Sequence, residues 1–271
     1  MESISPLDLD AAVELSERVR WPHRPADLHF LLTSGNGRIV RDERSGRALG
    51  VGMWIPYGDD VALMGMIIVD PAHQGMGIGR RLVETLMADA GDRTLLLNST
   101  DAGRPLYEKL GFRTLGGVLQ RQGTNRARAA RDASVRDARR SDKDAIVALD
   151  AEAFGAPRAG LIGRLLEDGR AVVSLADGAP SGYAVARPFG LGEVVGPVIA
   201  SSDEEAIALY KAIAARGFTR VDCPSEATGF STFLDEAGLR VVDRPIRMVL
   251  GEWTEPRQAS RVFALAGHAL G

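Results

Sequence analysis

The chain has 271 residues, of which 45% are hydrophobic, and its formal net charge at pH 7 is −3. This length exceeds one typical domain and supplies enough apolar residues for packed cores, so we expect two domains of about 130 residues each. The charge creates no basic field, which argues against nucleic acid as a partner. A single cysteine excludes an intramolecular disulfide and a cysteine-based metal site, and we expect no metal.

The N-terminal segment Met1–Leu15 carries acidic residues and no basic region of the kind that opens a signal peptide. No stretch of the chain approaches the roughly 18 uninterrupted apolar residues of a membrane span. We therefore expect a cytoplasmic protein with no membrane partner. A homo-oligomer is left open by the composition.

Helices and strands alternate along the first half. Helical spacing of apolar residues predicts helices at 9–22, from about 77–80 onward, and at 105–110, with a helical or irregular segment near 21–30. The predicted strands are a short one at 3–5, then 37–42, 48–57, 64–69 and 94–99, and a strand pair within 112–119 that is split at Gly116-Gly117. The run at 64–69 is apolar almost throughout, as expected of a strand covered on both faces.

This apolar strand leads through a glycine-rich turn directly into a helix. Gly75, Gly77 and Gly79 lie within five residues, which is costly unless the backbone turns sharply or approaches something closely. The main-chain N–H groups of the turn lie at a helix N-terminus, whose dipole favours an anion, and Arg80 and Arg81 add positive charge. A phosphate or pyrophosphate is the expected ligand.

Three kinds of phosphate loop can be compared with this turn. A P-loop needs a Lys-Ser/Thr pair after its last glycine, where this chain has Arg80-Arg81. A dinucleotide fingerprint needs the spacing G-x-G-x-x-G and an acidic residue at the tip of the next strand, and both are missing. The pattern Q-x-x-G-x-G after a strand fits Gln74, Gly77 and Gly79. It resembles the acetyl-CoA pyrophosphate loop of the GCN5-related N-acetyltransferase (GNAT) family.

A second motif follows at Pro105–Phe112, which reads PLYEKLGF and is similar to the segment that closes the site in the same family. Pro105 suits a first helical turn, and Gly111 suits a left-handed helix end. Tyr107 occupies the position of the family's tyrosine, so the resemblance implies that Tyr107 is catalytic and protonates the leaving CoA thiolate. The alternative is a tyrosine packed in a core with its hydroxyl group satisfied.

The resemblance also implies where acetyl-CoA, the expected co-substrate, would bind. Main-chain groups of the central strand would pair with the pantetheine arm, and an N–H near Val69 would polarise the thioester carbonyl. Thr100 stands where relatives often carry an asparagine that faces the cofactor. The implied cofactor-binding residues are Ile68, Val69, Gln74, Gly75, Met76, Gly77, Ile78, Gly79, Arg80 and Thr100.

The general base is not evident in the sequence. Many relatives use a carboxylate on the central strand, whereas residues 64–67 of this chain read MGMI. An acidic wall at Asp59-Asp60 would also suit a cationic amine. The remaining candidates, besides a chain of waters, are Asp59, Asp60, His23, His29 and Asp101.

From about residue 134 the order of elements repeats. The predicted strands open at Val135 and continue at 171–176, 183–188, 193–199 and 219–223; the predicted helices follow Asp142, contain Leu161–Leu166, follow Ser202, and span 230–237. A constant offset of 127 residues, as from Gly111 to Gly238, sets the two copies in register.

At that offset the functional positions of the two copies differ. Gly77 corresponds to Glu204, and a leucine stands in the place of Tyr107. Carboxylates suit a helix N-terminus but repel a pyrophosphate placed on the same N–H groups. The second copy is therefore predicted to keep the fold without binding CoA.

The fold class expected is α/β (α+β), with two tandem GNAT-like domains, each a mixed, mostly antiparallel central sheet flanked by helices. The arginine-rich stretch at 121–131 favours a linker or an exposed helix. We expect a GNAT acetyltransferase domain at 1–122, a basic linker at 123–132 and a degenerate GNAT-like domain at 133–271. Its tail, 252–271, is expected to form a final docked helix.

The resemblance implies an acyltransferase that moves an acetyl group from acetyl-CoA to a primary amine of a small molecule or an amino acid. Transfer would be direct, in a ternary complex, with the second copy shaping the pocket. One alternative is a catalytically silent CoA-binding sensor or scaffold, and another is a nucleotide-dependent oxidoreductase. No motif identifies the acceptor or the length of the acyl group.

Overall fold

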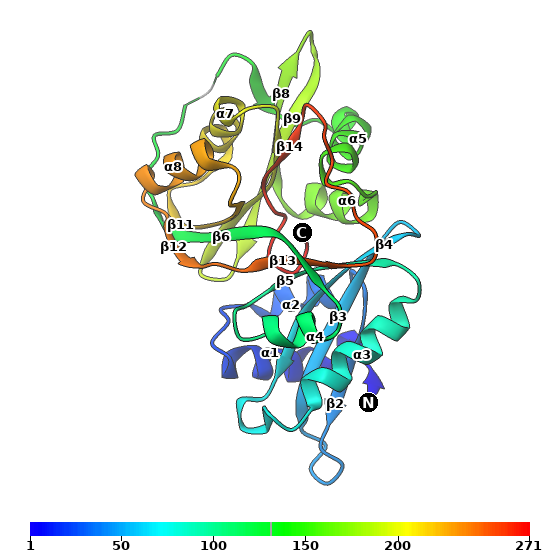
Figure 1. The fold of residues 1–271 in the computed structure, drawn as a ribbon. Helices are drawn as coiled ribbons and strands as arrows, with labels where there is room; N and C mark the ends of the chain where they lie inside the picture. Colours follow the sequence, from blue (N-terminus) through cyan, green and yellow to red (C-terminus); the bar gives the residue numbers. More distant parts are fainter. Residues whose placement is uncertain (131) are drawn as a thin grey trace.

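The structure is a computed structural model that describes residues 1–130 and 132–271. Its N-terminal half forms one lobe and its C-terminal half the other, and strands cross between them (Figure 1). The expectation for the arginine-rich stretch includes Arg131, which lies outside the described residues. Among the helices of the described residues, none combines the length and the apolar character needed to cross a bilayer.

The first half follows the predicted order of elements closely. Its strands are β1 (Glu2–Ser3), β2 (Asn36–Arg41), β3 (Ala48–Tyr57), β4 (Val61–Val69), β5 (Thr94–Ser99) and β6 (Arg113–Asn125). Its helices are α1 (Leu9–Arg18), α2 (Pro25–Leu32), α3 (Ile78–Ala90) and α4 (Arg104–Lys109), with short 3-10 turns η1 (Pro6–Asp8) and η2 (Pro71–His73). Leu82, Val83 and Leu86 recur at helical spacing and are fully buried, because they pack α3 on the sheet. Gly111 ends α4 in the left-handed region, with φ of +91°.

The second half repeats this alternation. Its strands are β7 (Val135–Asp137), β8 (Arg170–Ala176), β9 (Ala179–Phe189), β10 (Gly192–Ala200), β11 (Gly217–Pro224), β12 (Arg240–Asp243), β13 (Ile246–Leu250) and β14 (Arg261–Ala264). Its helices are α5 (Lys143–Phe154), α6 (Ala159–Asp168), α7 (Asp203–Ile213) and α8 (Thr228–Glu236), with the 3-10 turn η3 (Arg140–Asp142). The expected helix in the tail is wrong, since the tail contains the strand β14 and irregular segments.

The strands join one mixed sheet. Its order is β1-β2-β3-β4-β5-β13-β6-β11-β10-β9-β8-β7, with β12 beside β6 and β14 beside β10. β4 runs parallel to β5, and β10 runs parallel to β11, whereas the other pairs are antiparallel. The predicted fold class, two tandem GNAT-like domains of mixed, mostly antiparallel strands flanked by helices, is confirmed, and the sheets of the two domains are continuous.

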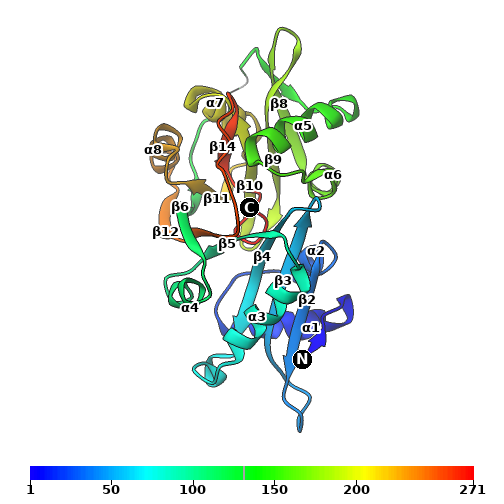
Figure 2. The same cartoon turned by 45° about the vertical axis from the view of Figure 1, so that its right-hand side comes forward.

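The two halves exchange strands at the middle of this sheet. β13, from the second half, lies between β5 and β6, while β6, from the first half, pairs with β11 through the register Asn125 with Gly217 (Figures 1 and 2). β6 is one 13-residue strand, so the predicted split at Gly116-Gly117 is wrong. The expected linker from residue 123 also begins inside β6. Its arginines suggested an exposed segment, but Arg121 is buried and donates to Ser231 and to a main-chain carbonyl.

The interface between the halves is a hydrophobic core. One cluster of buried side chains includes Leu28 and Ile39 from the first half and Ile162 and Tyr183 from the second. Arg158 is fully buried there, and its ion pair with Asp150 spans 2.7 Å. Contacts of this kind fix one half against the other.

The last residues of the tail pass between the halves. The Tyr57 hydroxyl donates to the carbonyl of Leu270 over 2.5 Å, and Arg158 Nη1 donates to the carbonyl of Gly271 over 2.8 Å. Phe263 to Ala266 are buried. The last part of the tail, from Phe263 onward, is therefore an internal element of the fold, and it reaches the site described next.

Candidate functional site

β4 and β5 pair over only part of their length. Their parallel ladder joins Val61–Met64 to Thr94–Leu97 and ends there. Just beyond, Met66 has φ of +53°, and the register of β4 against β3 shifts next to Met53. A bulge of this kind bends a strand and increases its twist. The final residues of β4 thus diverge from β5 and leave a gap between the two strands.

The end of β4 turns main-chain groups toward this gap. The N–H of Asp70 donates to the carbonyl of Leu49 in β3 over 2.8 Å. Hydrogen-bonded and non-hydrogen-bonded pairs alternate along an antiparallel ladder, so the N–H of Val69 faces away from β3. The carbonyl of Val69 accepts the Gln74 side-chain amide over 3.2 Å. The N–H of Val69 is thus oriented as the implied thioester contact requires.

The glycine loop has the backbone that its sequence predicts. Gly75 and Gly77 both have φ of +78°, a region that favours glycine. Gly77 is the N-cap of α3 and provides no side chain to cap it, and a Cβ at either glycine would meet no atom within 4 Å. The N–H groups in the first turn of α3 therefore face open space, where an anion can bind.

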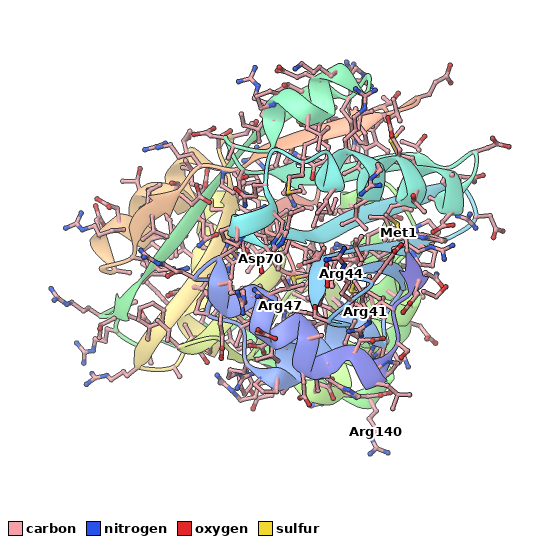
Figure 3. All side chains as sticks on the ribbon, turned by 90° about the horizontal axis from the view of Figure 1, so that it is seen from below. Met1, Arg41, Arg44, Arg47, Asp70 and Arg140 are labelled. Atoms are coloured by element: carbon pink, nitrogen blue, oxygen red, sulfur yellow. The ribbon has the colours of Figure 1, made fainter. Side chains whose placement is uncertain are left out.

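Asp70 anchors the start of this loop. Its side chain is buried and forms an ion pair with Arg47 (Figure 3). It also accepts the N–H of Ala72 over 2.9 Å and forms an ion pair with Arg18 over 3.3 Å. Burial alone would raise the pKa of Asp70, but these donors and cations outweigh it and lower the pKa. The carboxylate stays charged and holds the loop against β3.

A chamber of about 1040 Å³ extends from the glycine loop past the gap in the sheet to the second half. Its lining includes nine of the predicted site residues: Ile68, Val69, Gln74, Gly75, Gly77, Gly79, Arg80, Thr100 and Tyr107. Met76 is 67% exposed, and Ile78 is buried toward Gly50, so the side chains of these two predicted residues lie outside the lining. Only their main-chain groups face the loop.

Two other predicted side chains have local partners. Arg80 is exposed and donates to Glu84 over 2.8 Å. The Thr100 hydroxyl accepts the N–H of Gly103 over 3.3 Å, at the turn into α4. Both residues nevertheless line the chamber.

Tyr107 lies on α4 and faces the same chamber. Its side chain is buried, and its ring packs edge-to-face on Phe112 with 5.6 Å between the centroids. Burial raises the pKa of Tyr107, so the phenol is protonated at neutral pH. Among the residues that the structure describes, none forms a hydrogen bond with this hydroxyl. The arrangement is not that of a core tyrosine whose hydroxyl is satisfied.

The predicted candidates for the general base are widely scattered. Asp59 and Asp60 are exposed in the turn before β4, roughly 30 Å from its far end at about 3.3 Å per residue. His29 and Asp101 are exposed and do not line the chamber. His23 does line it, with Nδ1 at 2.9 Å from the Ser16 hydroxyl oxygen, but burial lowers its pKa to about 4. The acidic wall expected at Asp59-Asp60 is therefore wrong.

A histidine that the sequence analysis missed lies closer to the gap. His268 belongs to the tail, and its Nε2 is 2.9 Å from the carbonyl oxygen of Asn98, at the end of β5. The Asn98 side chain donates back to the carbonyl of His268 over 2.8 Å. Because a carbonyl oxygen can only accept, Nε2 carries the proton and Nδ1 keeps its lone pair when the ring is neutral. Burial lowers the pKa of His268, which favours that neutral form.

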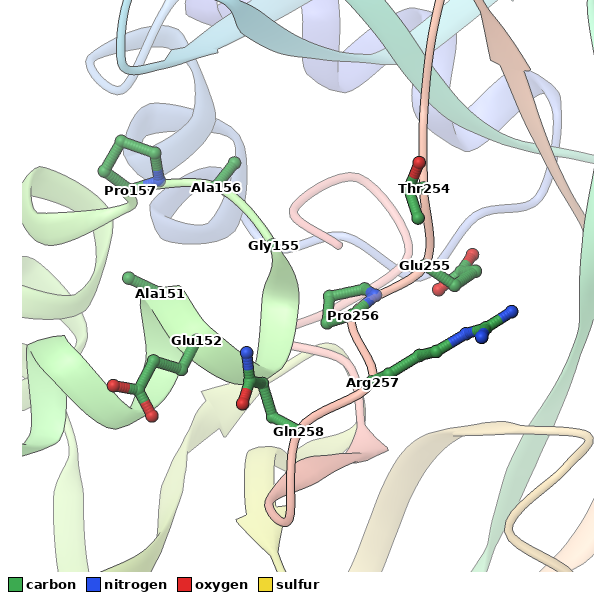
Figure 4. A pocket seen from close by; sticks show the side chains of 10 residues that line it. All are labelled: Ala151, Glu152, Gly155, Ala156, Pro157, Thr254, Glu255, Pro256, Arg257 and Gln258. Atoms are coloured by element: carbon green, nitrogen blue, oxygen red, sulfur yellow. The ribbon is translucent and has the colours of Figure 1, made fainter.

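A second hollow lies on another side of the molecule. It has a volume of about 500 Å³ and is formed by the end of α5 and the segment 254–258 (Figure 4). It shares no lining residue with the chamber. Across residues 1–130 and 132–271, the structure contains no group of three His, Cys, Asp or Glu side chains arranged to hold a metal.

Comparison with known proteins agrees with this geometry. A sequence profile of the acetyltransferase (GNAT) domain matches residues 30–114, and another matches 146–264. The uncharacterized N-acetyltransferase YitH of Bacillus subtilis (strain 168) is 31% identical over 215 residues, which are 77% of this chain and 76% of that protein. The chain belongs to the GNAT acetyltransferase family. This GNAT protein is also 33% identical over 105 residues to the N-alpha-acetyltransferase RimI of Mycobacterium tuberculosis (strain ATCC 25618 / H37Rv), covering 35% of this chain and 63% of that one.

Solved structures share the tandem fold. A putative acetyltransferase from Pyrococcus horikoshii superposes with a TM-score of 0.82 at 18% identity, over 100% of this chain and 95% of that one. A tandem GNAT protein from the clavulanic acid biosynthesis pathway superposes with a TM-score of 0.66 at 16% identity, over 93% and 98%. At these identities the likeness concerns the fold alone. The two-domain type predicted for this GNAT protein is confirmed.

Proposed function

We propose that this GNAT protein transfers an acetyl group from acetyl-CoA directly to a primary amine of a small molecule or amino acid, within a ternary complex. One observation carries the proposal: the uncapped glycine loop, the outward N–H of Val69 and the Tyr107 hydroxyl all border one chamber. Membership of the family indicates acyl transfer in general. The chamber supports the more specific proposal of direct acetyl transfer to an amine.

The roles of the residues follow from this geometry. The N–H groups from Gly75 to Arg80 would hold the diphosphate of acetyl-CoA, and the edge of β4 would align its pantetheine arm. The amine nitrogen attacks the thioester carbon, and the N–H of Val69 stabilises the charge on the oxygen. As the carbon–sulfur bond breaks, Tyr107 gives its proton to the sulfur.

His268 is the group that we propose takes the proton from the attacking amine. It lies beside the gap where β4 and β5 separate, and its Nδ1 has a lone pair when Nε2–H is held by Asn98. The second half thus contributes a residue to the reaction centre. A base supplied by the tail replaces the carboxylate that many relatives carry on the central strand.

The deciding experiment measures release of CoA thiol from acetyl-CoA against a panel of amines. Tyr107→Phe should slow release at least about tenfold, as expected for loss of a general acid, while acetyl-CoA still raises the melting temperature. Tyr210→Phe is the matched control, because the Tyr210 hydroxyl is buried in the second half, has no hydrogen-bond partner among the described residues and lies outside the chamber. If Tyr107→Phe left thiol release unchanged, Tyr107 would not be the general acid.

A catalytically silent CoA-binding scaffold is the competing function. It is favoured if the wild-type protein binds acetyl-CoA but releases no thiol with any amine. An oxidoreductase would instead be stabilised by NADH and not by acetyl-CoA.

A further inference from the structure

Arg187 lies on β9 at the end of the chamber formed by the second half. Its side chain is only 7% exposed, and it lines the chamber. The guanidinium carbon is 5.4 Å from the ring centroid of Phe30 and 5.1 Å from that of Phe189. The two rings fix the plane of the guanidinium without neutralising its charge.

No carboxylate of the described residues forms an ion pair with Arg187. Within that part of the chain, the one hydrogen bond of its side chain is a long one, 3.3 Å from Nη2 to the carbonyl of Ala266, and its Nε has no partner. Buried arginines elsewhere are paired: Arg158 with Asp150 at 2.7 Å, and Arg220 with Asp222 at 2.9 Å. A buried and unpaired cation is unusual in a protein interior.

The charges around Arg187 are already engaged with one another. Asp27 is the strongest attractive charge for Arg187, but it is bound by Arg24 over 2.7 Å and by the N–H of Gly190 over 2.9 Å. Arg220 and Arg24 repel Arg187, and Asp222 is paired with Arg220. Burial lowers the pKa of Arg187 to about 10, so the side chain is still cationic at neutral pH. The charge of Arg187 is therefore not neutralised by an ion pair with any of these neighbours.

We propose that Arg187 binds an anionic oxygen group, a carboxylate or a phosphate, on the acceptor itself, so that the acceptor is an amino acid or an amine that bears phosphate. The inference rests on the proposed function and deepens it by naming the acceptor class. A guanidinium offers paired donors that match either group. Among the described residues no hydrogen bond occupies Nη1 of Arg187, and that of Nη2 is long, so these two terminal nitrogens are the donors proposed for the ligand. An amine that bears no carboxylate or phosphate would leave the Arg187 cation without a partner.

Direct binding tests the inference without requiring turnover. Ligand-observed NMR in the presence of CoA would compare leucine with isopentylamine, β-alanine with propylamine, and phosphoethanolamine with ethanolamine. In at least one pair we expect the anionic member to bind and the simple amine to bind at least about tenfold more weakly. Preferential binding of leucine or β-alanine would identify a carboxylate as the group that Arg187 binds. Preferential binding of phosphoethanolamine would identify a phosphate. Equal binding within all three pairs, or binding of the simple amines alone, would overturn the inference.

Variants separate recognition from packing. Arg187→Met should weaken the preferred ligand about 10- to 100-fold, and Arg187→Lys, which keeps the charge but loses the fork, should weaken it less. Arg164→Met is the matched control, because the Arg164 guanidinium carbon lies 4.2 Å from the same Phe30 ring and the residue does not line the chamber. This control should leave the preference for the anionic ligand unchanged.

The melting temperature distinguishes a merely structural arginine. Removing a buried cation that has no partner should leave the melting temperature of Arg187→Met unchanged or higher. A lower melting temperature together with an intact preference for the anionic ligand would show that Arg187 serves packing only, and the inference would fail. Failure of the proposed function has a different signature: no thiol release with any amine, whatever the binding preference.

Discussion

The two halves of this GNAT protein share a fold but differ at the helix N-terminus that follows the central strand. In the first half, Gly77 precedes α3 and leaves the N–H groups of its first turn uncapped. In the second half, the Ser202 hydroxyl caps α7 by accepting the N–H of Glu205 over 3.2 Å, and the Glu205 carboxylate accepts the N–H of Ser201 over 2.7 Å. One N-terminus is open to an external anion, and the other is closed by its own side chains.

The position of Tyr107 also differs between the two halves. Tyr107 presents a hydroxyl to the chamber, whereas Leu234, its counterpart on α8, is fully buried among apolar side chains. The second half contributes instead to the far wall of the chamber, through Arg187 and His268. Two copies of one fold can thus have different functions, because the backbone is retained while a few side chains at corresponding positions differ.

The strongest test of this comparison moves a carboxylate into the open loop. Gly77→Asp should weaken acetyl-CoA binding about 100-fold, or about 2.7 kcal/mol, since it places a negative charge beside the diphosphate. Gly77→Asn is the matched control, because both side chains tolerate a positive φ and only one is charged. Calorimetric titration with acetyl-CoA measures both. A similar loss in the two variants would show that the added side chain acts through its shape and not through its charge.

The next test concerns the histidine that the tail supplies. His268→Gln should lower kcat/KM at least about tenfold, as expected for loss of a general base, with little change in acetyl-CoA affinity. Burial lowers the pKa of His268 below its ordinary 6.5, so the neutral, proton-accepting ring persists below that pH and is lost only as the pH falls through the lowered value. The acidic limb of the wild-type pH profile should therefore lie below 6.5 and disappear in the variant. An unchanged acidic limb would exclude His268 as the base.

Asp70 offers a smaller effect on stability. Asp70→Asn should lower the free energy of unfolding by about 1–2 kcal/mol at pH 7, because Arg47 and Arg18 lose their buried partner while remaining over a third exposed themselves. The folded-state pKa lies below the ordinary 3.8, so this stabilisation is full above about pH 4 and is lost as the pH falls through the folded value. Denaturant titrations of both proteins from pH 7 downward should converge as the pH falls through this lowered folded-state pKa. Parallel curves would contradict the assignment.

The smallest effect is expected at the closed N-terminus. Ser202→Ala removes the cap of α7 and should cost about 1 kcal/mol of stability. Acetyl-CoA affinity should not change, since α7 does not line the chamber. If the variant instead opened a second CoA site, titration would report two bound ligands, and the explanation from Glu204 and Glu205 would be wrong.

Local features of the sequence predicted the loop well. A strand, three closely spaced glycines and a helix within 64–90 define a turn with positive φ at Gly75 and Gly77, because these dihedrals depend on neighbouring residues alone. The same holds for Tyr107 on its short helix, which has Pro105 in its first turn and Gly111 just after its end. The roles assigned to these residues are predictions that the binding and rate measurements address.

Only the tertiary structure decided the rest of the chamber. The first part of the arginine-rich stretch, residues 121–125, belongs to β6 because β11 pairs with it. No periodicity near Arg121 predicts that pairing. His268 reaches Asn98 across 170 residues, and Arg187 meets Phe30 from the other half. Contacts between distant segments depend on how two sheets exchange strands and pack, so local spacing determined the phosphate loop, while the wall opposite it was set by packing.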